Sequence, residues 1–576
     1  MKKNIFSVAL AGLALLSLGS CSESDYDSKY QDPSATNVAS VPDVFTAVLK
    51  EGNTWMNPMY YRYYCQTTTS AVFSGLRGDA NTKGRFQGAG EARYNDRWKQ
   101  FYNMLTQHRL LTKVYNETDD AQKPNTKVFY ICSRTIINAQ LHEMLSLFGA
   151  VPYNGACTLW ENSDYAGAKE KDVYESDVDL YKQILAELKE SADFFASEAI
   201  PTAAQTSLKN KDITVAAGRT EYWQRYVNSL RLRIALHLAT NGELAAEAKA
   251  TIKEVVENPT KYPVIESNDQ NMGIETSTVN DDFNFGKSLS QALHGGYSPS
   301  PTYLKALNVP ADGMPDANTD PRISVLLDCN PDGAYITFDL TKSNSEISNL
   351  EQEKQQGYIA NGITGAKYYC TFDSTAYAGI AEYNGNMNTF GLWISAAEVS
   401  LSKAEAYVMG YGVAKDEAKA KACFVEGVKQ STEYYWNVKE GSSFYDKNNP
   451  NDSYYSKRAL VRPSVADVEA YANAIWAPTQ EAVCTQLWLN FNWTNYLEGW
   501  NVVRRTGYPA VEFAKDAIIV NYPTPPGRLP YPSSELTYNA ENCQAAISKY
   551  YKEPLGYYTT LFWAKEVYYK LNGTSN

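Results

Sequence analysis

The chain has 576 residues, of which 44% are hydrophobic and 20% are charged, a balance typical of a folded globular protein. Its formal net charge is −12, with 53 Lys and Arg against 65 Asp and Glu. An acidic surface repels phosphate backbones, so composition argues against nucleic acid as a partner. The 44 Tyr and 11 Trp suit contact surfaces that stay wet, although we expect most of the Tyr in the core.

The N-terminus has the parts of a bacterial secretion signal. Lys2 and Lys3 form a positive region, residues 5–18 form an uncharged apolar run, and Leu18-Gly19-Ser20-Cys21 follows. The run is short for a membrane span, so residues 1–20 are predicted to be a cleaved signal peptide. A Leu and two small residues before a Cys match the bacterial lipobox, which predicts lipidation of Cys21. The alternative is an ordinary signal peptide with a chance Cys.

Residues 21–39 are predicted to be a flexible tether after that anchor. Glu23, Asp25 and Asp27 follow Cys21 directly, and acidic residues at this place resemble the surface-export signal of Gram-negative lipoproteins. We therefore expect an outer-membrane protein that is held by lipid alone and faces the cell exterior. Residues 40–576 are predicted to form a single domain, with no later run apolar enough to cross a membrane. The eight later cysteines lack the spacing of a disulfide framework or a zinc site.

Hydrophobic periodicity predicts a mainly α-helical fold. Between residues 393 and 433 the pattern is that of a helical hairpin with Gly410-Tyr411-Gly412 as its turn, which resembles a degenerate tetratricopeptide unit. The predicted helices are Arg93–Tyr115, Asn125–Leu147, Ser176–Phe195, Thr220–Thr240, Leu244–Glu257, Trp393–Met409, Lys415–Glu433 and Gln480–Leu497.

Three segments lack a helical period. Residues 259–392 are rich in Gly, Asn, Ser, Pro and Tyr, and we expect a loop-rich insert with short β-hairpins laid over the helices. Residues 71–91 and 436–464 are also predicted to be loops. Binding residues usually lie in irregular loops on a rigid frame, so these segments are the first candidates for a site.

The sequence lacks the motifs of common enzymes. His142-Glu143 starts like a zinc-protease helix, but the second His is missing. There is no Walker loop, dinucleotide glycine pattern or GxSxG elbow, so we predict no catalytic residue, no metal and no cofactor. A glycosidase carboxylate pair stays open, because such a pair is defined by a distance across the fold.

Residues 328–339 have two interpretations. Acidic and amide residues follow the positions of a calcium loop, but Pro331 lies inside it and Asp339 stands where a bidentate Glu is expected. The alternative is a β-hairpin, in which strands Ile323–Cys329 and Ala334–Leu340 flank an Asn-Pro-Asp-Gly turn. The turn chemistry favours the hairpin.

Several phrases, in order behind the lipobox, resemble the SusD/RagB family of nutrient-binding lipoproteins. They are LFGAVPY at 147–153, WQRYVNSLRLR at 223–233, DPR at 320–322, SAAEV with AEA at 395–399 and 404–406, RRTGYP at 504–509 and RLPYP at 528–532. Ala150 stands where the family commonly has Asp. The loop around Val151-Pro152-Tyr153 resembles that of the family's second, SusD-like branch.

The resemblance implies a tetratricopeptide-like scaffold of helix pairs in a right-handed superhelix, covered on one side by long loops and short β-hairpins. It also implies a function without catalysis, the binding of nutrient oligomers and their delivery to a SusC-type TonB-dependent outer-membrane transporter. The chemistry of the motif arginines indicates a structural role, in which a buried Arg fork pairs with Glu398, Glu405 or loop carbonyls. These arginines are Arg231, Arg233, Arg322, Arg504 and Arg505.

Sugars present flat C–H faces and hydroxyl edges, so a site for them needs aromatic rings and polar side chains. We predict oligosaccharides as the ligand, with peptides as an alternative, bound by loop residues that helical periodicity does not assign to the core. The predicted ligand-binding residues are Phe73, Arg77, Asp79, Phe86, Tyr358, Asn361, Tyr368, Tyr369, Tyr377, Tyr383 and Asn384. Each aromatic residue has the alternative of packing its own loop. Two other functions stay open, a secreted glycoside hydrolase and a transporter lid that binds nothing itself.

Overall fold

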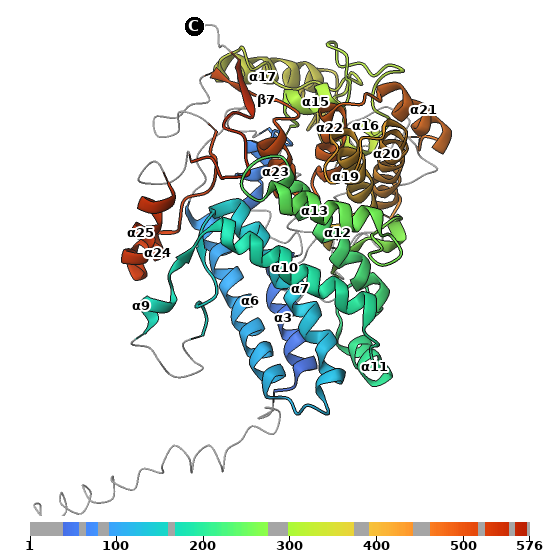
Figure 1. Cartoon of the computed structure of the whole chain (residues 1–576). Coiled ribbons are helices and arrows are strands. Elements are labelled where there is room, and N and C mark those ends of the chain that lie inside the picture. The colour runs from blue at the N-terminus through green and yellow to red at the C-terminus, as the bar shows by residue number, and fades with distance from the viewer. Residues whose placement is uncertain are drawn as a thin grey trace, which may run out of the picture. The chain divides into compact units, whose positions relative to one another are not determined.

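The computed structural model describes residues 39–56, 65–78, 91–158, 167–274, 298–373, 391–441, 461–515, 525–551 and 559–572. The chain divides into two units, Met1–Ser40 and Val41–Asn576, and every element named below lies in the second unit (Figure 1). Within the described residues, no helix is both long and apolar enough to span a bilayer.

Helices dominate this unit, as the periodicity predicts. From the N-terminus they are α3 (Val41–Met56), α5 (Ser70–Phe73), α6 (Glu91–Glu117), α7 (Lys123–Phe148), α9 (Ala168–Lys171), α10 (Asp177–Ser197), α11 (Thr202–Lys211), α12 (Thr220–Ala239), α13 (Ala245–Glu257) and the 3₁₀-helix η1 (Asn268–Gln270). They continue with α15 (Pro301–Ala306), α16 (Ile323–Leu326), α17 (Asn344–Ala360), α19 (Ala396–Met409), α20 (Glu417–Glu440), α21 (Val465–Ile475), α22 (Gln480–Phe491), α23 (Tyr496–Thr506), α24 (Ser533–Tyr538) and α25 (Ala540–Tyr550).

Helices α3, α6, α7 and α10 form one packed group, in which α3 contacts both α6 and α7 (Figure 1). Aromatic rings hold this group to α12. Phe45 of α3 lies 5.6 Å from the ring of Phe129 and 6.1 Å from the ring of Trp223, in edge-to-face arrangements. Such ring pairs stabilise a fold by more than the apolar area they bury, so they help to hold α3 against α7 and α12.

The helical hairpin predicted between residues 393 and 433 is found as α19 and α20. Trp393 and Ile394 belong instead to strand β6 (Gly391–Ile394), and α20 continues to Glu440, into the segment 436–464 that is predicted to be a loop. Ser395 caps α19 by accepting a hydrogen bond from the backbone N–H of Glu398, and Gly410 ends it with a left-handed φ of 70°. Gly412 also has a positive φ, and a Cβ there would lie 2.0 Å from the carbonyl oxygen of Lys249. The glycine turn therefore lets this hairpin approach α13 closely.

One predicted helix, Gln480–Leu497, is wrong as a single element. It is broken at Asn492, whose φ of 27° is incompatible with a continuing right-handed helix, and α23 starts anew at Tyr496. Asn495 caps α23 by accepting from the backbone N–H of Glu498. The residues 480–497 therefore contain α22 and only the start of α23, and these two helices pack against each other.

Helix α17 lies within the segment that we expected to be loops. Residues 344–356 of this helix are polar except Ile347 and Leu350, and only Ile347 and Tyr358 of the whole helix are buried. Periodicity does not detect a helix that buries so narrow a stripe. Its start is nonetheless encoded, because Ser343 and Glu346 form a capping box.

The strands are short and pair over long sequence distances. They are β1 (Val151–Pro152) with β2 (Tyr174–Glu175), β3 (Met272–Ile274) with β6 (Gly391–Ile394), β4 (Leu327–Asp328) with β5 (Thr371–Phe372), all antiparallel, and β7 (Val511–Ala514) with β8 (Tyr569–Asn572), which are parallel. The hairpin predicted for Ile323–Cys329 and Ala334–Leu340 is wrong, since Ile323–Leu326 is helical and β4 pairs with β5 instead. The turn predicted at residues 330–333 is present, because the backbone N–H of Gly333 donates to the carbonyl of Asn330.

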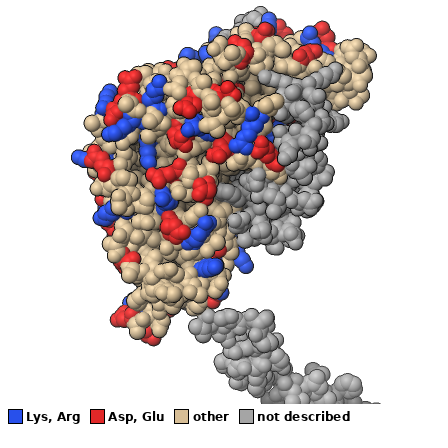
Figure 2. Space-filling model, turned by 90° about the vertical axis from the view of Figure 1, so that its right-hand side faces the viewer, with Lys and Arg blue, Asp and Glu red and all other residues tan. Residues whose placement is uncertain are grey.

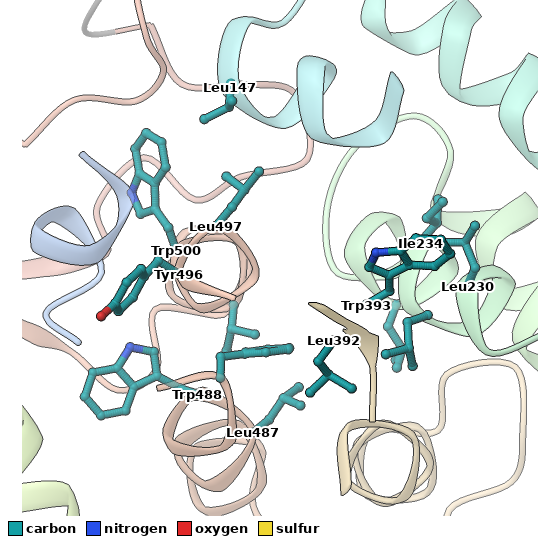
Figure 3. Close-up of a cluster of buried hydrophobic side chains, with 14 of the residues drawn as sticks. Leu147, Leu230, Ile234, Leu392, Trp393, Leu487, Trp488, Tyr496, Leu497 and Trp500 are labelled. Atoms are coloured by element: carbon teal, nitrogen blue, oxygen red, sulfur yellow. The ribbon is translucent and has the colours of Figure 1, made fainter. Parts of the chain in front are cut away.

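The core contains large aromatic side chains from distant segments. Figure 3 shows Trp488 of α22 and Trp500 of α23 on one side and Trp393 of β6 beside α12 on the other. The indole N–H of Trp488 donates to the carbonyl of Ser74, and that of Trp393 donates to the carbonyl of Met56. These rings thus fill volume and also satisfy loop carbonyls that water does not reach.

The partners predicted for the motif arginines are found for Arg233, Arg504 and Arg505, whereas Arg231 pairs with Glu254 and Arg322 with Asp320 instead. Arg233 forms two hydrogen bonds to Glu398, at 2.5 and 2.7 Å, and a third to the carbonyl of Trp393. Arg505 and Glu405 form a second two-pronged pair, with both side chains buried. At the surface, by contrast, acidic and basic side chains are interspersed on the face in Figure 2, without a large patch of one sign.

Candidate ligand-binding surface

Helix α17 and the chain that follows it form the part of the predicted site that the structure describes. The helix ends at Ala360, and Gly362 takes a left-handed φ of 81° directly after it. Its N–H donates to the carbonyl of Ile359, and that of Ile363 donates to the carbonyl of Tyr358. This reversal returns residues 363–373 along the helix, which brings three of the predicted tyrosines together.

Two of these tyrosines anchor the arrangement. The hydroxyl of Tyr369 donates to the carbonyl of Ile347 at 3.1 Å, and the hydroxyl of Tyr358 donates to Asp332 at 2.6 Å. Both side chains are buried, with 3% and 8% exposed. They therefore hold α17 to the loop below it and offer a ligand little surface of their own.

Tyr368 is the half-buried member of the group. Its ring lies 5.1 Å from that of Tyr369, and the ammonium of Lys354 lies 5.8 Å from its centroid. Its backbone carbonyl accepts a hydrogen bond from Asn330, whose own side chain shapes the turn at 330–334. Asn361 and Ile359 are exposed at the end of α17. We call Tyr368, Lys354, Ile359 and Asn361 the α17 surface.

The electrostatics of the two buried tyrosines that anchor this surface suit a structural role. Burial raises the pKa of Tyr358, and its hydrogen bond to Asp332 raises it further. Burial also raises the pKa of Tyr369, with Glu351 acting in the same direction. Both hydroxyls thus stay protonated near neutral pH, as donors to fixed partners, and neither is a ready general base. No group of metal-ligating side chains occurs within the described residues.

Two other predicted ligand residues lie in the core. Phe73 belongs to α5, is fully buried and packs on Trp500 at 5.3 Å. Arg77 is 1% exposed. The glycine-rich sequence around them indicated a loop, but α5 and the turn after it are covered by α23, so neither side chain faces a ligand in solution.

The remaining predicted site residues are not among those that the structure describes. Asp79, Phe86, Tyr377, Tyr383, Asn384 and the lipidation site Cys21 lie outside the described residues. Lys354 is not among the predicted site residues, and the sequence indicates Asp332 only as part of the turn or calcium loop at 328–339. The Asn-Pro-Asp-Gly turn is the signal that places Asp332 near an ordered loop, whereas nothing in the polar sequence of α17 singles out Lys354.

A family model for SusD-like proteins, described as starch-binding and associating with the outer membrane, matches residues 46–532. This chain belongs to the SusD-like family. The match confirms the resemblance drawn from the motifs, and with it the mainly helical, tetratricopeptide-like fold class. No curated protein matches the chain.

Solved SusD-like structures share the fold over nearly their whole length. A chitin-binding protein has 18% identity and a TM-score of 0.66, covering 90% of this chain and 100% of its own. A SusD homolog from Parabacteroides distasonis has 17% identity and a TM-score of 0.63, with 93% and 100% covered. A chitin-binding SusD homolog from Flavobacterium johnsoniae has 17% identity and a TM-score of 0.58, with 90% and 98% covered.

Proposed function

We propose that this SusD-like protein binds oligosaccharides at the cell surface and delivers them to a SusC-type TonB-dependent transporter. The observation that carries the proposal is the α17 surface, where a half-buried tyrosine ring lies beside the ammonium of Lys354 and the amide of Asn361 is exposed at the end of the same helix. An aromatic ring accepts the C–H face of a sugar, and the polar groups accept its hydroxyl edge. The family description and the two chitin-binding relatives support a glycan as the ligand class.

Replacing Tyr368 with Ala is expected to weaken oligosaccharide binding about two- to tenfold, since stacking on one aromatic ring contributes about 0.5–1.5 kcal/mol. Calorimetric titration of the mature chain with chitin and starch oligosaccharides measures this. Tyr538→Ala is the matched control, because Tyr538 is 89% exposed on α24 and lies outside the α17 surface. Equal affinities for wild type and Tyr368→Ala, with binding intact, would remove the α17 surface from the proposal.

The same titrations separate the alternatives. Release of reducing sugar by the purified protein would support the glycoside hydrolase. Absence of any heat with glycans, together with tight association with the transporter, would support a lid that binds nothing itself.

The proposal places the protein on the outer membrane through a lipid on Cys21, after removal of residues 1–20. We expect Cys21→Ala to abolish incorporation of labelled fatty acid and to shift the protein from the membrane fraction to the soluble extracytoplasmic fraction. Cys543→Ala is the control for loss of a thiol, since that residue is buried in α25. Unchanged labelling of the Cys21 variant would contradict the anchor without affecting the glycan site.

A further inference from the structure

A cavity of about 250 Å³ lies where α15, α20, α21 and α22 meet the strands β7 and β8. It does not include any residue of the α17 surface. Its volume is just below that of typical small-molecule sites, which start at about 300 Å³, so it fits only a compact ligand. One face of α22 lines it through the first two turns of that helix, at Glu481, Ala482, Thr485 and Gln486.

Gln486 supplies a fixed hydrogen-bond donor to this cavity. Its side chain is only 4% exposed, and its oxygen accepts a hydrogen bond from the guanidinium of Arg322. Arg322 is itself held by Asp320 at 2.9 and 2.6 Å. Since a guanidinium only donates, the amide oxygen of Gln486 must point to Arg322, and its NH₂ group is left for the cavity. In the described structure that NH₂ group forms no hydrogen bond.

The rim carries charges of both signs. Lys305 lies 3.3 Å from Glu512, which also accepts a hydrogen bond from Asn572 at 2.9 Å, so these two charges are mutually engaged. Glu481 and Lys570 also line the cavity, and among the described residues neither forms an ion pair or a side-chain hydrogen bond. One carboxylate and one ammonium are thus available to a ligand on the same rim.

The remaining wall is apolar, through Ala306, Ile475 and Pro509. Its one aromatic lining residue, Phe424, is fully buried and packs on Trp476, so it offers no open ring face to a sugar. The cavity therefore differs in chemistry from the α17 surface and favours a ligand with opposite charges and an apolar body.

We propose that this cavity binds a small zwitterion, a free amino acid or a short peptide. Glu481 receives the ammonium group, Lys570 and the NH₂ group of Gln486 receive the carboxylate, and the apolar wall receives the side chain. The site is independent of the proposed glycan function, because the two share no residue.

The test is a titration of the full mature chain with the dipeptide alanyl-leucine, followed by two-dimensional NMR or calorimetry. We expect Glu481→Gln and Lys570→Met each to weaken binding about three- to fivefold, the effect of one exposed charge pair. Gln486→Glu keeps an acceptor for Arg322 but turns a carboxylate toward the ligand, so we expect a loss of about tenfold or more. Thermal unfolding of the Gln486 variant checks that the fold is kept.

Capped peptides assign each contact. An N-acetylated dipeptide should bind more weakly and be insensitive to Glu481→Gln, and a C-amidated one should be insensitive to Lys570→Met. Glu469→Gln and Lys209→Met, both exposed and outside the cavity, serve as matched controls. The proposal is overturned by equal binding of capped and free peptides, by absence of binding at millimolar peptide, or by glycans competing for the site. Glycan binding with no peptide binding would leave the proposed function intact and remove this site.

Discussion

Replacing Arg505 with Met is expected to lower the free energy of unfolding by about 3–5 kcal/mol, the cost of removing one partner from a buried ion pair. Arg505 on α23 donates to both oxygens of Glu405 on α19, at 2.5 and 2.6 Å, and the two side chains are 4% and 0% exposed. Burial alone would raise the pKa of Glu405, but Arg505 lowers it below its ordinary value. Without the guanidinium, a carboxylate stays in the core with the amide of Gln480, at 2.9 Å, and the thiol of Cys484 as its remaining side-chain donors.

Urea unfolding of the wild type and the variant measures the loss. The control is Lys419→Met, which breaks an exposed pair with Asp416 and should change the free energy of unfolding by less than about 0.5 kcal/mol. The double variant Arg505→Met with Glu405→Leu should recover much of the stability, because it leaves no buried charge behind. A loss below about 1 kcal/mol for Arg505→Met alone would show that the carboxylate finds another partner or takes up a proton.

Local sequence patterns predict most helices of this fold and the involvement of its arginines in buried ion pairs. The α19–α20 hairpin has small contact residues and a glycine turn within 45 residues of chain, so its signal is contained in one window. The sequence predicts that the motif arginines pair with Glu398, Glu405 or loop carbonyls, because an unpaired charge in a buried helix is costly. Which arginine pairs with which glutamate depends on the fold. The strands could not be predicted, since β3 and β6 pair across more than 100 residues and each is only 3 or 4 residues long.

Part of the candidate site can also be predicted from local sequence, and part depends on the fold. An aromatic residue in a loop-rich sequence indicates a contact with a ligand, and this pattern selects Tyr358, Tyr368 and Tyr369. Which ring faces outward depends on the chain reversal after α17, which buries Tyr358 and Tyr369 and leaves Tyr368 half open. Phe73 illustrates the converse, because a four-residue helix with no periodic signal carries it into the core.

The second large effect concerns acid. We expect the wild type to lose about 2 kcal/mol of stability between pH 7 and pH 5 through His108 alone. His108 is buried on α6, with its Nδ1 2.8 Å from the hydroxyl of Ser133 on α7. Burial lowers its pKa from 6.5 to about 3, and the nearby positive charges of Arg109 and Arg134 act in the same direction.

The sign follows from proton uptake. The folded protein keeps His108 neutral above about pH 3, whereas the unfolded chain protonates it below about pH 6.5. Since the unfolded state binds more protons in this window, stability is fully present above it and falls as the pH drops through it. A pH of 5 lies about 1.5 units below the pKa of His108 in the unfolded chain, and each unit below that pKa lowers the free energy of unfolding by about 1.36 kcal/mol.

His108→Gln tests this, since an amide can still bond to Ser133 but does not titrate between pH 7 and pH 5. We expect the difference in unfolding free energy between the two pH values to shrink by about 2 kcal/mol in the variant. Some acid sensitivity should remain, because burial and then the neighbouring His142, Arg504 and Arg505 also lower the pKa of His237. Parallel pH profiles for wild type and variant would contradict the prediction, because they would mean that the folded protein protonates His108 as readily as the unfolded chain does.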